Sequence, residues 1–364
     1  MPTTTPRIDG FRMPAEWEHH SGCVMIWPER PDNWRDNARP AQAAFAAIAS
    51  TIARYENLTM IVSPRQTGAA RAALPDTVRL LTINTDDSWA RDVGPVFVTD
   101  AKSRLRAVDF PFNAWGGLEH GLYTPWDRDD ALARNLCTAL SVPRYRAPCV
   151  IEGGAIHVDG AGTALVTEPC LLDPARNPGV TKAAVETWLA DYLGVRKTIW
   201  LGAGVPEDET GGHIDNLACF AAPGRVLLTW CDDPADPHHT VSRDAAARLE
   251  TATDARGKRI EIEKLPMPPR MTITDVEARG VAPADNGMNR AAGTRLAASY
   301  ANFYIANGAV IAPGFGVETD EAARAVLARG FPGRDIVMLP AREILLGGGN
   351  IHCITCQIPE GDPG

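Results

Sequence analysis

The sequence has no long apolar segment and no excess of positive charge. None of its apolar runs approaches the roughly 18 residues that a membrane span needs, and residues 1–14 lack the basic and apolar regions of a secretion signal. Lys and Arg number 36 against 45 Asp and Glu, which gives a formal net charge of −9. Such a chain repels nucleic acid and attracts cations. We therefore expect a cytoplasmic protein that binds a small basic molecule, with neither nucleic acid nor membrane as a partner.

The sequence also lacks low-complexity tracts, blocks of like charge and long flexible linkers, so no domain boundary is indicated. Short β-branched runs predict strands, and apolar residues at helical intervals predict helices between them. Strand–strand–helix–strand units around one axis would explain this alternation, although no repeat is visible residue by residue. We expect an α/β protein with one domain over residues 1–364. The predicted strands cover 23–27, 58–62, 78–83, 95–98, 164–167, 199–201, 225–230, 259–263, 305–312 and 335–339, and the predicted helices cover 41–55, 129–140, 181–194, 242–253 and 319–330.

The eight cysteines include only one pair with C-x-x-C spacing, so a four-cysteine zinc site is not indicated. That pair, Cys353 and Cys356, lies in LLGGGNIHCITC, which is typical of a strand entered through a glycine turn. On a strand, side chains three positions apart face opposite sides, which disfavours a disulfide between the two. Cys353 is then either an inert core cysteine or a nucleophile that faces a cleft. A redox role for the pair would require a reversible disulfide.

A histidine and a carboxylate stand two positions apart in DETGGHIDN, residues 208–216. If this segment is extended, His213 and Asp215 share one face, which suits proton transfer beside a bound cation. A surface turn with a solvated histidine would explain the same pattern. A second pair, His157 and Asp159, precedes Gly160 and is better explained by a hairpin turn.

Two further carboxylates stand beside apolar segments and turns. Asp92 lies in SWARDVGP, and Glu152 follows an apolar run in CVIEGGAIHV. Carboxylates in such surroundings are costly unless they are paired or used in function. Either one alone is compatible with a structural salt bridge. The combination of four glycine-flanked polar sites, each with a group that one reaction would need, favours a catalytic centre.

Together these motifs resemble those of the agmatine deiminases, which belong to the guanidino-group-modifying superfamily of pentein fold. The similar segments follow the family's order over nearly the whole chain. They are FRMPAEWEHHSGCVMIWPERPDNWR, WARDVGP, FNAWGG, EGGAIHVDG, DPARNP, ETGGHIDN, RLAASYANFYIANG and REILLGGGNIHCIT.

The resemblance implies a fold and a set of active-site residues. The fold would be a five-bladed α/β propeller with pseudo-fivefold ββαβ units around a central active site. Matching of the motifs makes Cys353 the nucleophile and His213 the acid and base. The same matching implies that Asp92, Asp215 and Glu152 are the catalytic carboxylates, and that Asp92, Asp215, Trp89, Trp115 and Gly348 contact the substrate.

The implied reaction is hydrolytic deimination of agmatine to N-carbamoylputrescine and ammonia, through a covalent amidino-cysteine intermediate. Asp92 and Asp215 would grip the planar guanidinium, while Glu152 would orient the histidine. No metal and no organic cofactor would be needed. The resemblance also implies a homodimer or a higher homo-oligomer.

Some positions depart from the family's pattern and leave the exact guanidino substrate open. Arginine, peptidylarginine or another alkylguanidine are alternatives within the same superfamily. A non-catalytic protein that captures polyamine-like cations is an alternative of another class, but binding alone would need neither Cys353 nor His213. The departures are Ala203, Pro206, Gly211 and Cys356.

Overall fold

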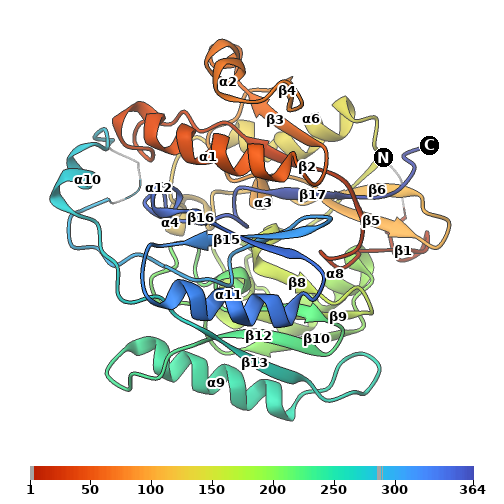
Figure 1. Ribbon diagram of the computed structural model, residues 1–364. Coiled ribbons are helices and arrows are strands. Elements are labelled where there is room, and N and C mark those ends of the chain that lie inside the picture. Colours follow the sequence, from red (N-terminus) through yellow and green to blue (C-terminus); the bar gives the residue numbers. More distant parts are fainter. Residues whose placement is uncertain (1–3, 285–287, 289) are drawn as a thin grey trace.

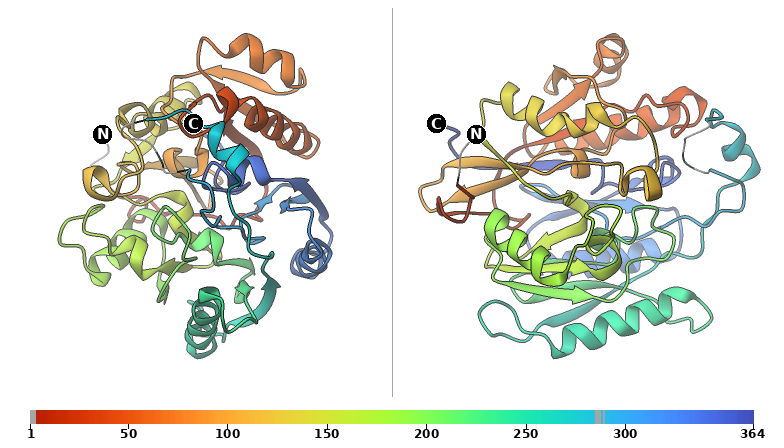
Figure 2. Two further views of the ribbon diagram at one scale, coloured as in Figure 1. Left: turned by 90° about the vertical axis from the view of Figure 1, so that its left-hand side faces the viewer. Right: turned by 180° about the vertical axis from the view of Figure 1, so that it is seen from behind.

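Five small β-sheets make up the framework of the protein in a computed structural model that describes residues 4–284, 288 and 290–364. The sheets follow one another round a common centre, and helices cover the outside (Figures 1 and 2). The expected five-bladed α/β propeller is therefore confirmed. The strands are β1 Phe11–Arg12, β2 His20–Ile26, β3 Leu58–Val62, β4 Arg79–Thr82, β5 Val96–Asp100, β6 Leu105–Asp109, β7 Arg144–Arg146, β8 Ile156–Val158, β9 Thr163–Thr167, β10 Lys197–Leu201, β11 Ala218–Ala222, β12 Arg225–Trp230, β13 Glu261–Pro266, β14 Tyr304–Ile305, β15 Ala309–Gly314, β16 Asp335–Pro340 and β17 Cys356–Pro359.

Each sheet repeats one unit of two antiparallel strands, a helical crossover and a parallel outer strand. In the fourth unit, β11 pairs antiparallel with β12, and α9 then leads to β13, which pairs parallel with β12. A parallel neighbour needs such a crossover because a tight turn can join only antiparallel strands. The helices are α1 Arg39–Ile52, α2 Thr67–Ala73, α3 Ala90–Val93, α4 Gly117–His120, α5 Asp127–Asp130, α6 Leu132–Ala139, α7 Glu168–Leu171, α8 Lys182–Leu193, α9 Pro237–Thr251, α10 Asp275–Arg279, α11 Thr319–Gly330 and α12 Arg342–Leu345, with short 3-10 turns η1 Asp36–Ala38, η2 Gly153–Ala155 and η3 Ile214–Asn216.

The two ends of the chain close the ring. Strand β17 pairs antiparallel with β2, in a register that sets Cys356 opposite Val24. The last strand of the chain thus becomes the inner strand of the first unit. This closure brings the segment before β17 to the centre of the molecule, beside α3.

Local sequence signals account well for several of these elements. The N-terminus of α8 is capped by Thr181, whose hydroxyl accepts a hydrogen bond from Ala184 N at 3.2 Å, and Gly194 ends the helix with a φ of 70°. Strands β3 and β12 and helix α11 span the predicted ranges. No helix within the described ranges is long and apolar enough to cross a membrane.

Three predicted elements differ from the structure. The predicted strand 305–312 is a hairpin in which Asn307 and Gly308 separate β14 from β15, because Asn-Gly favours a tight turn. The predicted helix 129–140 is divided into α5 and α6. The predicted strand through LLGGGNIHCITC begins only at Cys356, because the Thr355 hydroxyl donates to the carbonyls of Ile351 and His352 at 2.9 and 3.0 Å and stabilises a turn there.

Candidate active site

The thiol of Cys353 lies in the turn that precedes β17, near the centre of the propeller. Its Sγ lies 3.2 Å from Asn302 Nδ2 and 3.6 Å from Asp215 Oδ2. Burial, followed by the charges of Asp215 and Asp92, raises the pKa of the thiol well above its ordinary value. The thiol is therefore protonated at neutral pH when no cation is bound beside it.

The two oxygens of Asp215 have different surroundings. Oδ2 faces Nδ1 of His352 at 2.9 Å, whereas Oδ1 is buried and has no hydrogen-bond partner. Burial alone would raise the pKa of Asp215, but the hydrogen bond and charge of His352 outweigh it and lower the pKa below its ordinary value. Asp215 is thus an anion with one free acceptor oxygen. It belongs to the 3-10 turn η3, not to the extended segment that the sequence suggested.

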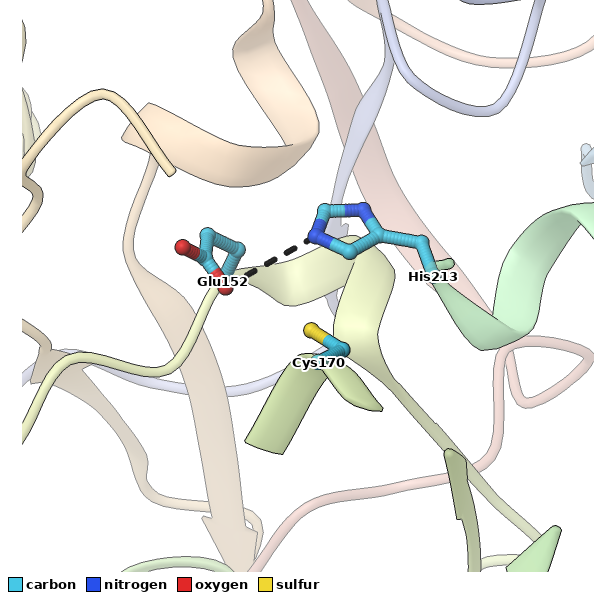
Figure 3. Close-up of side chains that lie close together, drawn as sticks. All are labelled: Glu152, Cys170 and His213. Atoms are coloured by element: carbon cyan, nitrogen blue, oxygen red, sulfur yellow. Dashed lines mark ion pairs between the residues drawn. The ribbon is translucent and has the colours of Figure 1, made fainter. Parts of the chain in front are cut away.

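The imidazole of His213 lies between two carboxylates. Its Nδ1 is 3.8 Å from Asp92 Oδ2, and its Nε2 is 3.6 Å from Glu152 Oε2. Figure 3 shows the ring turned toward Glu152, with the Cys170 thiol close to both. Burial alone would lower the pKa of His213, but Asp92 and the other groups around the ring raise it well above its ordinary value. The histidine is therefore a cation, suited to give a proton to a leaving group.

Asp92, on the short helix α3, is held by two donors. The Trp115 indole N–H donates to Oδ2 at 3.0 Å, and the Gly154 backbone N–H donates to Oδ1 at 2.9 Å. Burial raises the pKa of Asp92 to about 6, with the anions Asp215 and Glu152 adding to the effect while His213 opposes it.

Glu152 is paired with an arginine that sequence reasoning missed. Arg176 Nε donates to both carboxylate oxygens, at 2.9 and 3.2 Å. Burial opposes ionisation of Glu152, but Arg176 and His213 outweigh it and lower its pKa to about 2. DPARNP, the motif that contains Arg176, was the only signal in the sequence for this residue.

Gly154, in η2, is the point where these groups meet. A β-carbon there would lie 2.6 Å from His213 Nδ1, 2.9 Å from Asp215 Oδ2 and 2.9 Å from Asp92 Oδ1. Such distances leave no room for a side chain, so glycine is required for the close approach. The structure thus brings Asp92 to the His213–Asp215 pair, from which it is far apart in the sequence.

A small cavity opens onto the thiol. Trp89, Trp115 and Gly348, the expected substrate contacts, line this cavity together with Glu209, which the sequence did not indicate. Glu209 forms an ion pair with Arg290, yet its Oε2 is buried without a hydrogen-bond partner. The remaining lining residues are Asp92, Leu122, Thr210, Met288, Gly347, Gly349 and Cys353.

The other candidate groups do not share this site. Cys356 Sγ faces the Pro95 carbonyl at 3.5 Å and not Cys353, and both thiols are free, which gives no support to a redox pair. Asp159 accepts backbone hydrogen bonds from Ala161 and Thr163 across the turn between β8 and β9, as predicted for a hairpin.

One group of donors within the described ranges has the geometry for a metal ion, namely Glu152, Cys170 and His213, whose ligand atoms lie within 4.8 Å of one another. Both oxygens of Glu152 already face Arg176, so the charge that would attract a cation is balanced. The arrangement fits a histidine held by a carboxylate better than a metal centre.

Comparisons with known proteins agree with this geometry. A family model described as Porphyromonas-type peptidyl-arginine deiminase matches residues 12–359. The chain is 52% identical over 360 residues to the agmatine deiminase of Pseudomonas aeruginosa strain LESB58 and 51% identical over 359 residues to that of Stutzerimonas stutzeri, with 98% of each chain covered in both cases.

Solved structures of agmatine deiminases also match this chain. The agmatine deiminase of Enterococcus faecalis superposes with a TM-score of 0.97, at 43% identity and 99% coverage of both chains. A Campylobacter jejuni agmatine deiminase, at 24% identity and a TM-score of 0.83, shares the fold. The chain therefore belongs to the Porphyromonas-type peptidyl-arginine deiminase family, within its agmatine deiminase branch.

Proposed function

We propose that this protein hydrolyses agmatine to N-carbamoylputrescine and ammonia. The relatives that are about half identical over nearly the full chain are agmatine deiminases. The observation that carries the proposal is that Asp215 lies against both the Cys353 thiol and the group formed by His213 and Asp92 at Gly154, while Cys353 and Asp92 line one small cavity.

The guanidinium would be held by the two carboxylates at the inner end of the cavity. Oδ1 of Asp215 is buried and unpaired, so it is ready to accept an N–H of a planar cation. Asp92 lies beside it, and the rings of Trp89 and Trp115 line the same space. A cation over an indole face gains further stabilisation.

The far end of the substrate would meet Glu209. Its buried, unpaired Oε2 is an acceptor for an alkylammonium group, and it lines the same cavity as Cys353. An anion at this point favours agmatine over free arginine, whose α-carboxylate it would repel. Peptidylarginine and simple alkylguanidines have no free terminal amine, so they gain nothing from this contact.

Attack by sulfur follows from the arrival of the cation. The guanidinium offsets the anions that hold the Cys353 proton, so the thiol loses its proton to solvent and becomes a thiolate. The sulfur attacks the guanidinium carbon to give a tetrahedral adduct. Protonated His213 gives its proton to the leaving nitrogen, which departs as ammonia. A cationic amidino-thioether remains on Cys353.

Hydrolysis reverses the role of the histidine. Neutral His213 takes a proton from water, and the resulting hydroxide attacks the amidino carbon. Collapse of the second tetrahedral adduct breaks the C–S bond and releases N-carbamoylputrescine, the thiolate and one proton, which leaves with ammonia as ammonium. Glu152, fixed by Arg176, keeps His213 oriented through both steps.

The experiment that tests this function is a substrate panel on the wild-type protein and Cys353→Ala. Ammonia release should be fastest with agmatine, and slow with arginine, a peptidylarginine and butylguanidine. Cys353→Ala should release none while keeping its melting temperature. Faster turnover of another guanidino compound would replace agmatine as the substrate, and turnover by the variant would remove Cys353 as nucleophile.

We propose further that residues 1–364 act as one catalytic domain without a cofactor, in the cytoplasm and as a homodimer or higher homo-oligomer. Light scattering after gel filtration measures the assembly, and dialysis against a chelator should leave the activity unchanged. A monomer, or loss of activity that a metal restores, would overturn the corresponding part.

A further inference from the structure

A buried row of charged side chains extends from Asp215 to the N-terminal segment. His352, next to the reactive cysteine in the sequence, faces Asp215 Oδ2 through Nδ1 at 2.9 Å. Through Nε2 it faces both oxygens of Glu16, at 2.9 and 3.1 Å. All three side chains are at most 3% exposed. The N-terminal segment before β2 is therefore connected to the active site through a single imidazole.

The geometry determines the protonation state of His352. A neutral imidazole carries one N–H, but here each ring nitrogen faces a carboxylate, so both must be donors. Burial and Arg91 would lower the pKa of His352, but Glu16 and Asp215 outweigh them and raise it. His352 is thus an imidazolium that bridges two buried anions.

The neighbouring His157 is neutral, in contrast to the charged His352. His157 Nδ1 accepts the backbone N–H of Phe220 at 3.3 Å, and its Nε2 lies 3.8 Å from Glu16. Burial lowers the pKa of His157 to about 4, so it is neutral. It stacks on His352 with ring centroids 6.5 Å apart. His157 therefore provides a matched buried histidine at the same carboxylate.

We propose that His352, held by Glu16, is a positioning residue that keeps Asp215 ionised and leaves its free oxygen for the guanidinium of the substrate. The inference rests on the proposed substrate contact of Asp215. The cation is needed because burial opposes ionisation of Asp215 and because the anion Asp92 lies beside it, which disfavours a second buried negative charge. With Oδ2 occupied by His352, Oδ1 remains the acceptor.

Other charged groups surround this row and do not replace His352. Arg91 Nη1 donates to Glu16 at 3.4 Å and, at a shorter 2.6 Å, to Gln357, and it has no hydrogen bond to Asp215 among those of the described residues. His213, the other cation near Asp215, is also held by Asp92 and Glu152. The titratable groups that face the Glu16–His352–Asp215 row from all sides are Arg91, Asp92, His157, His213, Cys219, Cys353 and Cys356.

The first test compares His352→Gln, Glu16→Gln and His157→Gln by the pH dependence of kcat/KM for agmatine. Glutamine at 352 can still donate to Asp215 but carries no charge. In His352→Gln, the acid limb of kcat/KM should move to higher pH by about one unit or more. It should also become steeper, because Asp92 and Asp215 then titrate together. Glu16→Gln should shift it less, in the same direction, and His157→Gln should leave it in place. An unshifted limb in a folded His352→Gln protein would overturn the proposal.

Binding without turnover separates positioning from a structural role. In a Cys353→Ala background, His352→Gln should weaken agmatine binding by roughly tenfold or more at pH 6 and by much less at pH 8. A loss that is equal at both pH values would mean general disruption and would overturn the proposal. If Asp215→Asn in the same background binds agmatine as tightly as its parent, the proposed function of Asp215 fails. If Asp215→Asn loses binding and His352→Gln does not, only the present inference fails.

A spectroscopic test measures the protonation state of His352 in the wild-type protein. The ¹⁵N shifts of labelled histidine distinguish an imidazolium from a neutral ring, and the His352→Gln spectrum assigns the signal. His352 should remain doubly protonated at pH 7.5, while His157 is neutral. A neutral His352 ring at that pH would contradict the proposal.

Discussion

The indole N–H of Trp115 donates to Oδ2 of Asp92 at 3.0 Å, and the same oxygen lies 3.8 Å from His213 Nδ1. Trp115 thus fixes the position of the Asp92 carboxylate. Only the family resemblance had indicated that Trp115 lies near the pocket. The contact turns Asp92 toward the site, and its buried surroundings raise its pKa to about 6.

The raised pKa of Asp92 predicts the pH at which activity falls on the acid side. A carboxyl with a pKa of about 6 is ionised above that value, so kcat/KM should fall as pH decreases through about 6. The bound guanidinium stabilises the anion, so the acid limb of kcat itself should lie lower. Steady-state kinetics from pH 5 to 9 measure both limbs. Coincident limbs for kcat and kcat/KM would show that Asp92 does not contact the cation.

A methyl group at Gly154 should disable the site. The β-carbon of Gly154→Ala would lie 2.6 Å from His213 Nδ1, so the imidazole and the carboxylates must move. We expect kcat/KM to fall by about 100-fold or more, with a loss of about 1–3 kcal/mol in the free energy of unfolding. Gly68→Ala in α2 is the control, because nothing lies within 4 Å of its β-carbon. Equal effects of the two substitutions would refute the assigned close approach.

Glu209 should determine affinity for the distal amine. Removal of its charge in Glu209→Gln should raise KM for agmatine by roughly 10- to 100-fold, since a buried charge-assisted contact is lost. KM for butylguanidine, which lacks the amine, should hardly change. Glu207→Gln, in the same loop but paired with His238 and Arg295, is the matched control. The assignment fails if both substrates are affected alike.

The Glu152–Arg176 pair should make stability depend on pH below neutrality. The pKa of Glu152 is depressed to about 2, so its contribution is present above the ordinary carboxyl value and is lost as pH falls from about 4.5 toward 2. Arg176→Gln removes the cation that donates to both oxygens of buried Glu152, leaves only His213 at 3.6 Å, and should cost about 3 kcal/mol at pH 7. Denaturant unfolding at pH 7 and at pH 4 checks this. A variant that is less destabilised at pH 4 supports the pairing, and an equal loss at both contradicts it.

The sequence predicted local elements because local chemistry specifies them. The Thr181 cap and Gly194 set both ends of α8, and the run 225–230 gives β12 unchanged. The hairpin at Asn307 was missed although Asn307-Gly308 is a turn signal, because the apolar residues on both sides resemble one continuous strand. Motifs also indicated the principal reactive groups, since glycines mark places where backbone and side chains approach closely, as at Gly154.

Contacts between distant segments could not be read from local pattern. Glu16 and His352 are 336 positions apart and meet only because β17 pairs with β2. The same closure places Cys353 in a turn and not on a strand. Glu209 stands in an acidic loop, and only its place in the lining of the cavity, with a buried oxygen that has no hydrogen-bond partner, distinguishes it.

The most direct test of the account is the mass of the protein after a rapid acid quench of a single turnover with agmatine. We predict a transient amidino adduct on the peptide that contains Cys353. If His213→Asn still expels ammonia, the adduct should accumulate in that variant, because His213 also activates the water that removes the adduct. The adduct should be absent in Cys353→Ala. Product formation without any adduct on Cys353, or an adduct on another cysteine such as Cys170, would contradict the account.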